Sequence, residues 1–244
     1  MIPLHTLYTP SHEPLFKQYF APSVPADMEL RMHFLENEGS GTFKQPDWHR
    51  AIIRKVEVII EAIHEHWGGV FVWSDVDVQF FGPFSEWVTR TTRRHDLVFQ
   101  VDAPGPGLCD GFFFCRANAT TLAIWEDVLE FVRKPESKGD DQWRVQQLAA
   151  ARTDTCIGYL PPLFMGGGTF TGQAWHPGQP VLLTRGLLMH HANFTIGVPN
   201  KLALCQAARE QWKQGATIPL DEACRRLGDP AQFQYDGEGS DLTH

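Results

Sequence analysis

An amphipathic helix that leads through two glycines into an apolar strand is the feature that most constrains the fold of this chain. From Trp48 to Trp67, apolar residues recur at helical spacing and form one stripe. Gly68 and Gly69 are typical of a helix end. The run from Val70 to Trp73 is entirely apolar, as expected of a strand in the middle of a sheet. This order predicts an α/β fold in which helices pack on a sheet.

Further segments extend the α/β pattern along the chain. We expect strands at Leu4 to Tyr8, Asp96 to Val101 and Phe112 to Cys115, an amphipathic helix marked by Leu122 to Val132, and another helix that ends near Ala151 and is capped by Asp140 or Asp141. Glycine and proline are frequent between residues 161 and 178, which predicts an irregular segment or lid.

Length and composition favour a single domain. The chain has 244 residues, of which 43% are hydrophobic, enough to bury a sizeable core. Domains average about 150 residues, so one large domain or a core with a small appendage fits this length. We expect one domain over residues 1–244, with a core at about 4–197, a helical appendage at 198–228 and a loose tail at 229–244.

Charge and cysteine content narrow the classes of partner and location. The formal net charge of −8 disfavours non-specific binding to nucleic acid. The five cysteines are odd in number and include no C-x-x-C pair, which favours a reducing compartment over a disulfide framework. The first residues lack the pattern of a signal peptide, and no apolar run reaches the ~18 residues of a membrane span. We therefore expect a cytoplasmic protein with no transmembrane segment and no nucleic-acid partner.

Two carboxylates follow the apolar strand. Asp75 and Asp77 lie in the sequence Trp-Ser-Asp-Val-Asp-Val, just past the expected strand end at Trp73. Ligands of open α/β sheets bind at this edge, and alternation in an extended segment places Asp75 and Asp77 on one side. Paired carboxylates suit a hard divalent cation bound to a diphosphate. The alternative is an ordinary polar turn after a strand.

Four short motifs, in this order, resemble the nucleotide-diphospho-sugar transferase family of GT-A-type glycosyltransferases. The segment Val70 to Phe84 is similar to its D-x-D segment, Cys109 to Arg116 to its strand beside the donor sugar, Asp140 to Gln142 to its D-Q element, and His191 to Phe194 to its late H-x-N motif. The likeness covers roughly Leu4 to Gly197. It implies a three-layer α/β/α sandwich with a mostly parallel twisted sheet, and transfer of a sugar from a nucleotide-diphosphate donor, here expected to be UDP-linked.

The resemblance also implies a metal site. In this family the D-x-D aspartates hold a divalent cation, Mn²⁺ or else Mg²⁺, that bridges the two phosphates of the donor. A metal acting as a Lewis acid stabilises the charge that builds up on the departing diphosphate. Carried over to this chain, Asp77 is the stronger ligand, Asp75 also reaches the ribose, and His191 completes the coordination. The adjacent His190 is the alternative to His191.

The same resemblance assigns residues to the nucleotide part of the donor. Thr6, Tyr8 and Thr9 follow the first strand, where the family receives the nucleoside. Tyr8 is expected to stack on a uracil, unless it is a half-buried structural residue. Ser74 in the D-x-D segment and Asn193 in the H-x-N motif are assigned to the donor as well.

Three more residues are assigned to the donor by their positions. Lys55 interrupts the apolar helix on its polar face, where the family often has a lysine, and an ammonium there would neutralise phosphate charge. The alternative is a solvated helix lysine. Asp110 and Gly111 stand where the family usually has Asn or Ser before Gly. An acidic side chain still accepts hydrogen bonds from sugar hydroxyls, and glycine permits close approach of the backbone.

The D-Q element supplies the expected catalytic residues, Asp141 and Gln142. If the reaction inverts the anomeric centre, Asp141 is the candidate general base. If the reaction retains configuration, this carboxylate orients the donor or stabilises positive charge. Its alternative role is to cap the helix. Asp102 is a candidate for contact with the acceptor, which we expect to be a glycan, a lipid-linked sugar or a small molecule.

Two other functions fit part of the pattern. A phosphatase of the haloacid-dehalogenase type also carries a D-x-D at a strand end, as nucleophile and acid. However, Gln79 stands where that motif has Thr or Val, and more than 70 residues precede Asp75. A non-catalytic nucleotide-sugar-binding module would keep the fold without turnover. The combined motifs favour a metal-dependent glycosyltransferase.

Overall fold

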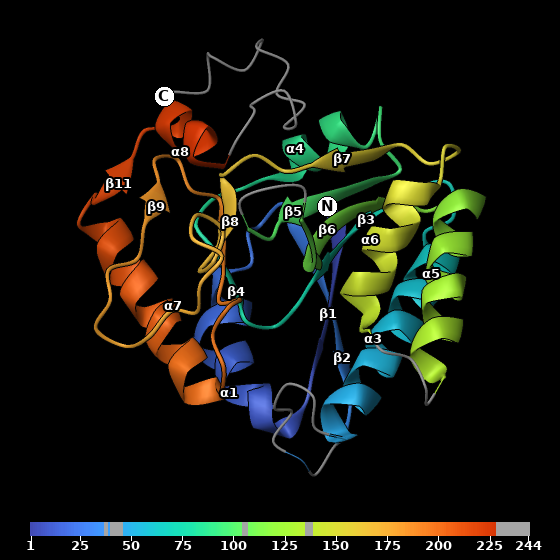
Figure 1. Ribbon diagram of the computed structural model, residues 1–244, viewed down its shortest axis with the longest axis horizontal. Coiled ribbons are helices and arrows are strands. Elements are labelled where there is room, and N and C mark those ends of the chain that lie inside the picture. Colours follow the sequence, from blue (N-terminus) through green and yellow to red (C-terminus); the bar gives the residue numbers. More distant parts are fainter. Residues whose placement is uncertain (37–38, 40–45, 104–106, 135–138, 228–244) are drawn as a thin grey trace.

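A six-stranded sheet runs through the centre of the protein (Figure 1). The computed structural model describes residues 1–36, 39, 46–103, 107–134 and 139–227. The strand order is β2-β1-β3-β6-β5-β7. The bounds are β1 Ile2–Tyr8, β2 Met28–Phe34, β3 Val70–Ser74, β5 Leu97–Val101, β6 Leu108–Arg116 and β7 Ile157–Tyr159.

The sheet is mostly parallel, as expected, with one reversed strand inside it. β1 pairs in parallel with β2 and with β3, and β5 pairs in parallel with β7. β6 is antiparallel to both of its neighbours, β3 and β5. Because of this reversal, the start of β6 lies beside the end of β3, where Ser74 is paired with Phe112. This edge of the sheet carries the candidate site.

Three helices cover one face of the sheet: α3 (Pro46–Glu65), α5 (Ala119–Arg133) and α6 (Asp141–Ala151). The predicted apolar stripe of α3 is buried at Val56, Ile59 and Ile63 and packs against the strands. Trp125 of α5 stacks on Phe113 of β6 at 5.1 Å between ring centroids. Packing of these large apolar side chains between helix and sheet is the main stabilising contribution of this layer.

The opposite face is covered by a smaller sheet and by helical segments. The smaller sheet has the order β4-β10-β8, formed by Val78–Phe80, Met189–His191 and Phe164–Gly166. The turns η1 Pro10–His12, α1 Glu13–Leu15, η2 Phe16–Phe20 and α2 Ala21–Ser23 follow β1, and α4 spans Ser85–Thr91. Phenylalanines from several of these elements form a compact buried cluster with the central strands: Phe80, Phe84, Phe112, Phe114 and Phe164.

The last described part of the chain is helical, as expected for the appendage. It contains α7 (Val198–Lys213) and α8 (Leu220–Leu227), with the two-stranded pair β9 (Leu183–Thr184) and β11 (Thr217–Ile218) beside them. Leu204, Cys205 and Ala208 of α7 are fully buried against Met165 and Leu15. The expected tail at 229–244 lies outside the described residues. Among the residues described, no helix combines the length and apolar character that crossing a membrane requires.

Three local expectations need correction. The D-x-D segment is not extended: β3 ends at Ser74, and residues 75–77 form a turn before β4. The segment 161–178 is not wholly irregular, because it contains β8. The cap of α6 is Asp140, whose carboxylate accepts from the backbone N–H of Trp143 at 2.8 Å, so Asp141 is the first helical residue and not the cap.

Candidate active site

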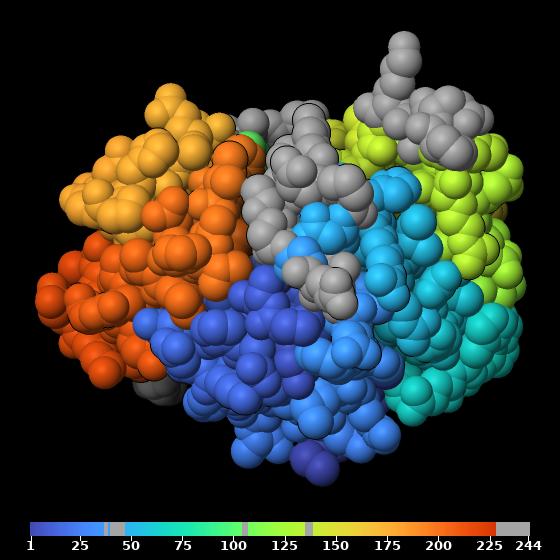
Figure 2. Space-filling view, turned by 90° about the horizontal axis from the view of Figure 1, so that it is seen from below, coloured from blue at the N-terminus to red at the C-terminus, as the bar shows by residue number. Residues whose placement is uncertain are grey.

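A cavity of about 580 Å³ opens where β1 and β3 end and β6 begins. Its walls come from the turns after β1, the first half of α3, the D-x-D turn and the segment from β10 into α7. The space-filling view from below shows the N-terminal segment in blue, α3 in lighter blue and the region near residue 200 in orange meeting on one face (Figure 2). Ten predicted site residues line the cavity: Tyr8, Thr9, Lys55, Asp75, Asp77, Asp110, Gly111, Gln142, His191 and Asn193. Thr6, Ser74 and Asp141 are buried and do not line it.

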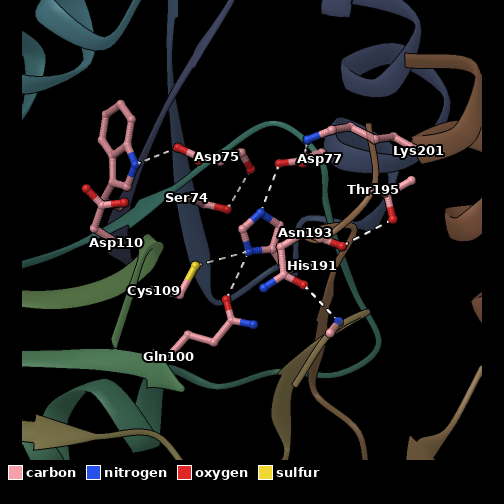
Figure 3. A network of polar contacts seen from close by, with 12 residues as sticks. Ser74, Asp75, Asp77, Gln100, Cys109, Asp110, His191, Asn193, Thr195 and Lys201 are labelled. Atoms are coloured by element: carbon pink, nitrogen blue, oxygen red, sulfur yellow. Dashed lines mark hydrogen bonds and ion pairs between the residues drawn. The ribbon is translucent and has the colours of Figure 1, made fainter. Parts of the chain in front are cut away.

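The predicted metal ligands converge. Asp75, Asp77 and His191 each offer a ligand atom, and these atoms lie within 4.8 Å of one another. His191 Nε2 is 3.1 Å from Asp77 Oδ1, and Figure 3 shows the imidazole between that carboxylate and Gln100. The Nδ1–H of His191 donates to Gln100 Oε1 at 3.0 Å, so in the neutral ring Nε2 carries a lone pair. Nε2 therefore faces the Asp77 carboxylate: with a proton it donates to that carboxylate, and without one its lone pair joins Asp75 and Asp77 in a donor set that fits a divalent metal.

His190 does not belong to this group. It neighbours His191 on β10, but alternation along the strand turns its ring to the other side. Both of its ring nitrogens are buried, and neither has a hydrogen-bond partner within the part of the chain that the structure describes. Burial, together with repulsion from His191, lowers the pKa of His190 to about 3, so this ring is neutral. The geometry therefore selects His191 over His190 as the candidate ligand.

A lysine that the sequence analysis missed completes the group. The Nζ of Lys201, in the first turns of α7, contacts Asp77 Oδ2. Burial alone would raise the pKa of Asp77, but Lys201 and His191 outweigh burial and hold it well below its usual value. The sequence gives one faint indication of this lysine, Gly197, four residues before it. In the structure Gly197 has a φ of 86°, which favours glycine, and it starts α7 so that the first residues of this helix line the cavity.

Lys55 is the centre of a buried acidic cluster, and the reading as a solvated lysine is wrong. Its side chain is 8% exposed, and its Nζ lies 2.9 Å from Asp141, 3.1 Å from Asp110 and 3.6 Å from Asp75. Burial disfavours the ammonium, but Asp110, Asp141 and Asp75 raise the pKa of Lys55 well above its usual value. The neighbouring Arg54 points elsewhere and pairs with Glu61 on the helix surface.

The carboxylates in this cluster differ in their proton affinity. Burial, followed by repulsion from Asp141, raises the pKa of Asp110 well above its usual value despite the attraction of Lys55. Burial also raises the pKa of Asp75, with repulsion from Asp77 adding to it. The indole N–H of Trp73 donates to Asp75 Oδ1 at 3.0 Å and fixes that carboxylate. The pKa of Asp75 is thus raised, whereas that of Asp77, two residues later, is lowered. Strongly shifted pKa values in neighbouring groups are typical of functional sites.

Gly111 leaves the space that the metal group needs. A Cβ at this position would lie 2.5 Å from His191 Cε1 and 2.9 Å from Asp75 Oδ2, both too close for a real side chain. The carbonyl of Gly111 also accepts from the backbone N–H of Asp75 at 2.7 Å, which ties the start of β6 to the D-x-D turn. Glycine at this position thus permits the close approach of His191 and Asp75, and its role beside a donor sugar stays a prediction.

Asp102 links the D-Q and H-x-N motifs. Its carboxylate accepts from Gln142 Nε2 at 3.2 Å and from Asn193 Nδ2 at 3.3 Å. All three side chains line the cavity. Asn193 Oδ1 in turn accepts from the backbone N–H of Gly168 at 3.3 Å. The D-Q and H-x-N motifs, distant in the sequence, therefore form one polar wall.

The end of β1 and the residue after it line one side of the cavity. Tyr8 is half buried, and its ring stacks on Phe16 at 4.3 Å with 6° between the planes. Thr9 is buried and its hydroxyl lies 3.0 Å from that of Ser11. Thr6 is buried inside the sheet, and its hydroxyl has no hydrogen-bond partner among the described residues. Tyr8 and Thr9 are placed to meet a ligand, whereas Thr6 lies behind the cavity wall.

Comparison with known proteins agrees with the fold. The nucleotide-diphospho-sugar transferase family matches the chain over residues 27–204. A solved structure, a glycosyltransferase involved in the glycosylation of the major capsid of PBCV-1, has a TM-score of 0.57 at 12% identity, covering 84% of this chain and 98% of that one. Mouse xyloside xylosyltransferase 1, in its apo form, has a TM-score of 0.44 at 10% identity, covering 79% and 97%. No curated protein matches the chain.

The architecture is that of the GT-A-type glycosyltransferases. The chain belongs to the nucleotide-diphospho-sugar transferase family and is a glycosyltransferase. This membership excludes the haloacid-dehalogenase-type phosphatase considered from the sequence.

Proposed function

We propose that this glycosyltransferase is metal-dependent and uses a UDP-linked sugar, with Mn²⁺ or Mg²⁺ as the cation. One observation carries the proposal: Asp75, Asp77 and His191 bring three ligand atoms within 4.8 Å of one another at the wall of the cavity. Oxygen-rich sites of this kind suit Mn²⁺ and Mg²⁺. When bound, the metal would supply Lewis-acid stabilisation of the departing diphosphate.

Two lysines of the chain favour the binding of a diphosphate at the same wall. Lys55 and Lys201 both line the cavity, on either side of the D-x-D turn. We assign to them the neutralisation of phosphate charge that the metal leaves uncompensated. The N-terminus of α7, which starts at the cavity with Gly197 and Val198, adds a helix dipole that is favourable for an anion. Tyr8 and Thr9 then face the nucleoside.

The sugar and the acceptor are assigned to the opposite polar wall. Gln142, Asp102 and Asn193 present amide and carboxylate groups to the cavity. Asp110 and Gly111 line the adjacent part of the wall, at the start of β6. Asp141 contacts Lys55 at 2.9 Å and is 3% exposed. That Asp141 and Gln142 act on the reacting sugars remains a prediction, with Gln142 the one of the two that faces the cavity.

The acceptor and the location are part of the same proposal. A glycan, a lipid-linked sugar or a small molecule fits a cavity of this size with a polar wall. All five cysteines are free thiols, which is compatible with a reducing cytoplasm. Detection of the protein in the cytoplasmic fraction of its own cell tests the location.

Calorimetry with UDP tests the function directly. UDP is titrated into the protein with Mn²⁺ and then with a chelator in its place. We expect binding that depends on Mn²⁺ and a loss of this dependence in Asp77→Ala, because Asp77 contacts the imidazole and the ammonium of the same group. Asp221→Ala is the matched control, since Asp221 is an exposed aspartate of α8. Equal UDP binding with and without the metal would refute the metal dependence.

A further inference from the structure

A second group of metal-binding side chains lies away from the cavity. His5 of β1, Glu65 at the end of α3 and His66 directly after that helix each offer a ligand atom, and these atoms lie within 4.8 Å of one another. Glu65 follows Lys55 by ten residues on one helix, which corresponds to about 15 Å. This group is therefore separate from the D-x-D site. None of its residues lines the cavity.

The imidazole of His5 is held from several sides. Its Nε2 lies 2.9 Å from His66 Nε2, and its Nδ1 lies 3.1 Å from His33 Nε2 on the neighbouring strand β2. The ring also stacks on His33 at 5.4 Å and meets Phe71 edge-on at 5.6 Å. His5 is 1% exposed. A ligand that is fixed in this way loses little conformational entropy when it binds a cation.

The hydrogen bond between His5 and His33 suits a metal ligand. Nδ1 of His5 faces His33 Nε2 at 3.1 Å, which leaves Nε2 of His5 directed at His66 and available to a cation. His33 provides the outer hydrogen bond that ligating histidines commonly make, because its Nε2 faces the remaining nitrogen of His5.

The route to solvent runs along Glu65 and His66. The Glu65 side chain is 50% exposed and its Oε1 lies 3.9 Å from His66 Nε2, whose side chain is 14% exposed. The inner ligand is thus buried while the outer two remain accessible. An exposed glutamate can change rotamer to approach the two imidazoles without moving the backbone.

We propose that His5, His66 and Glu65 form a Zn²⁺ site that ties the end of α3 to β1. Two imidazoles and one carboxylate are a zinc-type donor set, whereas Mg²⁺ and Ca²⁺ favour oxygen ligands. With Zn–N bonds of about 2.05 Å, tetrahedral nitrogen ligands lie about 3.3 Å apart, so the two Nε2 atoms have to separate by a few tenths of an ångström. Water completes the coordination from the exposed side.

Zinc titration in a protein without the D-x-D ligand tests the site. ZnCl2 is added, without nucleotide, to Asp77→Ala, so that binding is independent of the proposed function. Calorimetry should give one equivalent of Zn²⁺. The melting temperature should rise by about 5 °C or more when Zn²⁺ reaches a hundredfold excess over its Kd, because zinc binds only the folded state.

Three double variants separate the site from non-specific binding. Adding His66→Gln should remove the equivalent and the rise in melting temperature. Adding His64→Gln should leave both unchanged, because His64 is an exposed histidine on the same helix end outside the group. Adding Glu65→Gln, an exposed change that spares the fold, should weaken zinc binding about tenfold. Absence of zinc binding in Asp77→Ala, or equal binding in the His66→Gln and His64→Gln backgrounds, overturns the proposal.

Discussion

Lys55 and Arg54 are neighbours in the sequence with opposite surroundings. Lys55 is enclosed by three carboxylates, whereas the Arg54 side chain is 32% exposed and pairs with glutamates on the helix surface. Removal of one partner from a buried ionic cluster leaves uncompensated charge in a poorly solvated place. Exposed ion pairs contribute little by comparison.

Substitution of these two residues makes the difference measurable. Lys55→Ala is expected to lower the free energy of unfolding by about 3 kcal/mol at pH 7, and Arg54→Ala by less than about 0.5 kcal/mol. Urea unfolding of both variants gives the comparison. Equal losses in the two variants would show that the cluster around Lys55 is not what holds this part of α3.

Asp110 supplies a prediction about pH. Its pKa is raised in the folded protein, by burial first and by Asp141 second. The folded state then binds the proton more tightly than the unfolded state, so this group's contribution to stability is fully present below the ordinary aspartate pKa and declines as pH rises towards the folded-state pKa. Asp110→Asn cannot ionise and removes that decline.

Melting temperatures across a pH series test this sign. Between pH 4 and the raised folded-state pKa, the metal-free wild-type protein should lose more stability than Asp110→Asn. Asp221→Asn serves as control, because Arg225 lowers the pKa of this exposed carboxylate instead of raising it. Parallel curves for wild type and Asp110→Asn would contradict the assignment.

At the level of elements, β6 sets the shape of the site. It is reversed relative to β3 and β5, and its first residues deliver Asp110 and Gly111 to the cavity. Gly111→Ala should weaken Mn²⁺-dependent UDP binding at least about tenfold, or ~1.4 kcal/mol, because its Cβ would collide with His191. Calorimetry measures the change.

Gly107→Ala is the matched control for that substitution. A Cβ at Gly107, just before β6, would lie 3.7 Å from the nearest atom, which is ordinary van der Waals contact. UDP binding should therefore be unchanged. A comparable loss in both variants would mean that the start of β6 tolerates no side chain at all and that His191 is not the specific obstacle.

The same elements show what local sequence can and cannot predict. The stripe of α3 and the apolar run of β3 were predictable because helical and strand periodicity are local properties. The direction of β6 was not, since an apolar run carries no information about the orientation of its partner strands. The turn at residues 75–77 was foreseen only as the alternative to an extended, ligand-binding segment, yet it brings the two aspartates to one cavity.

Contacts between residues distant in the sequence were the second feature that could not be predicted from local sequence. Lys201 lies 124 positions from Asp77, and apart from Gly197, four residues before it, nothing near it in the sequence distinguishes it from a surface lysine. Asp141 was identified as a site residue, but its contact with Lys55 depends on how α3 and α6 pack. The motifs therefore predicted most of the residues at the cavity, while the packing of helices decided which of them pair.

At the scale of the whole molecule, α7 joins the site to the core of the C-terminal region. Lys201 and the buried Leu204 lie within one turn of each other, so a single helix both contacts Asp77 and packs on the protein. A chain that ends at residue 197 loses both. We expect it to bind UDP neither with nor without Mn²⁺ and to melt at a lower temperature than residues 1–227.

Calorimetry and thermal unfolding of these two truncated chains provide the test. If residues 1–197 retained metal-dependent UDP binding, α7 would be an appendage in the functional sense as well, and Lys201 would be dispensable. The longer chain keeps both α7 and α8 and so controls for truncation itself.

The contact between Lys201 and Asp77 has a consequence for how the binding of metal and the binding of nucleotide depend on each other. A divalent ion that binds Asp77 Oδ2 displaces the ammonium of Lys201 from that oxygen. The net gain in positive charge beside the carboxylate is then one elementary charge instead of two. The displaced Lys201 side chain remains close to the site, because α7 holds its backbone there, and it can pair with another anion. A pyrophosphate is such an anion. The metal ion and the nucleotide should therefore each raise the binding affinity of the other by the same factor.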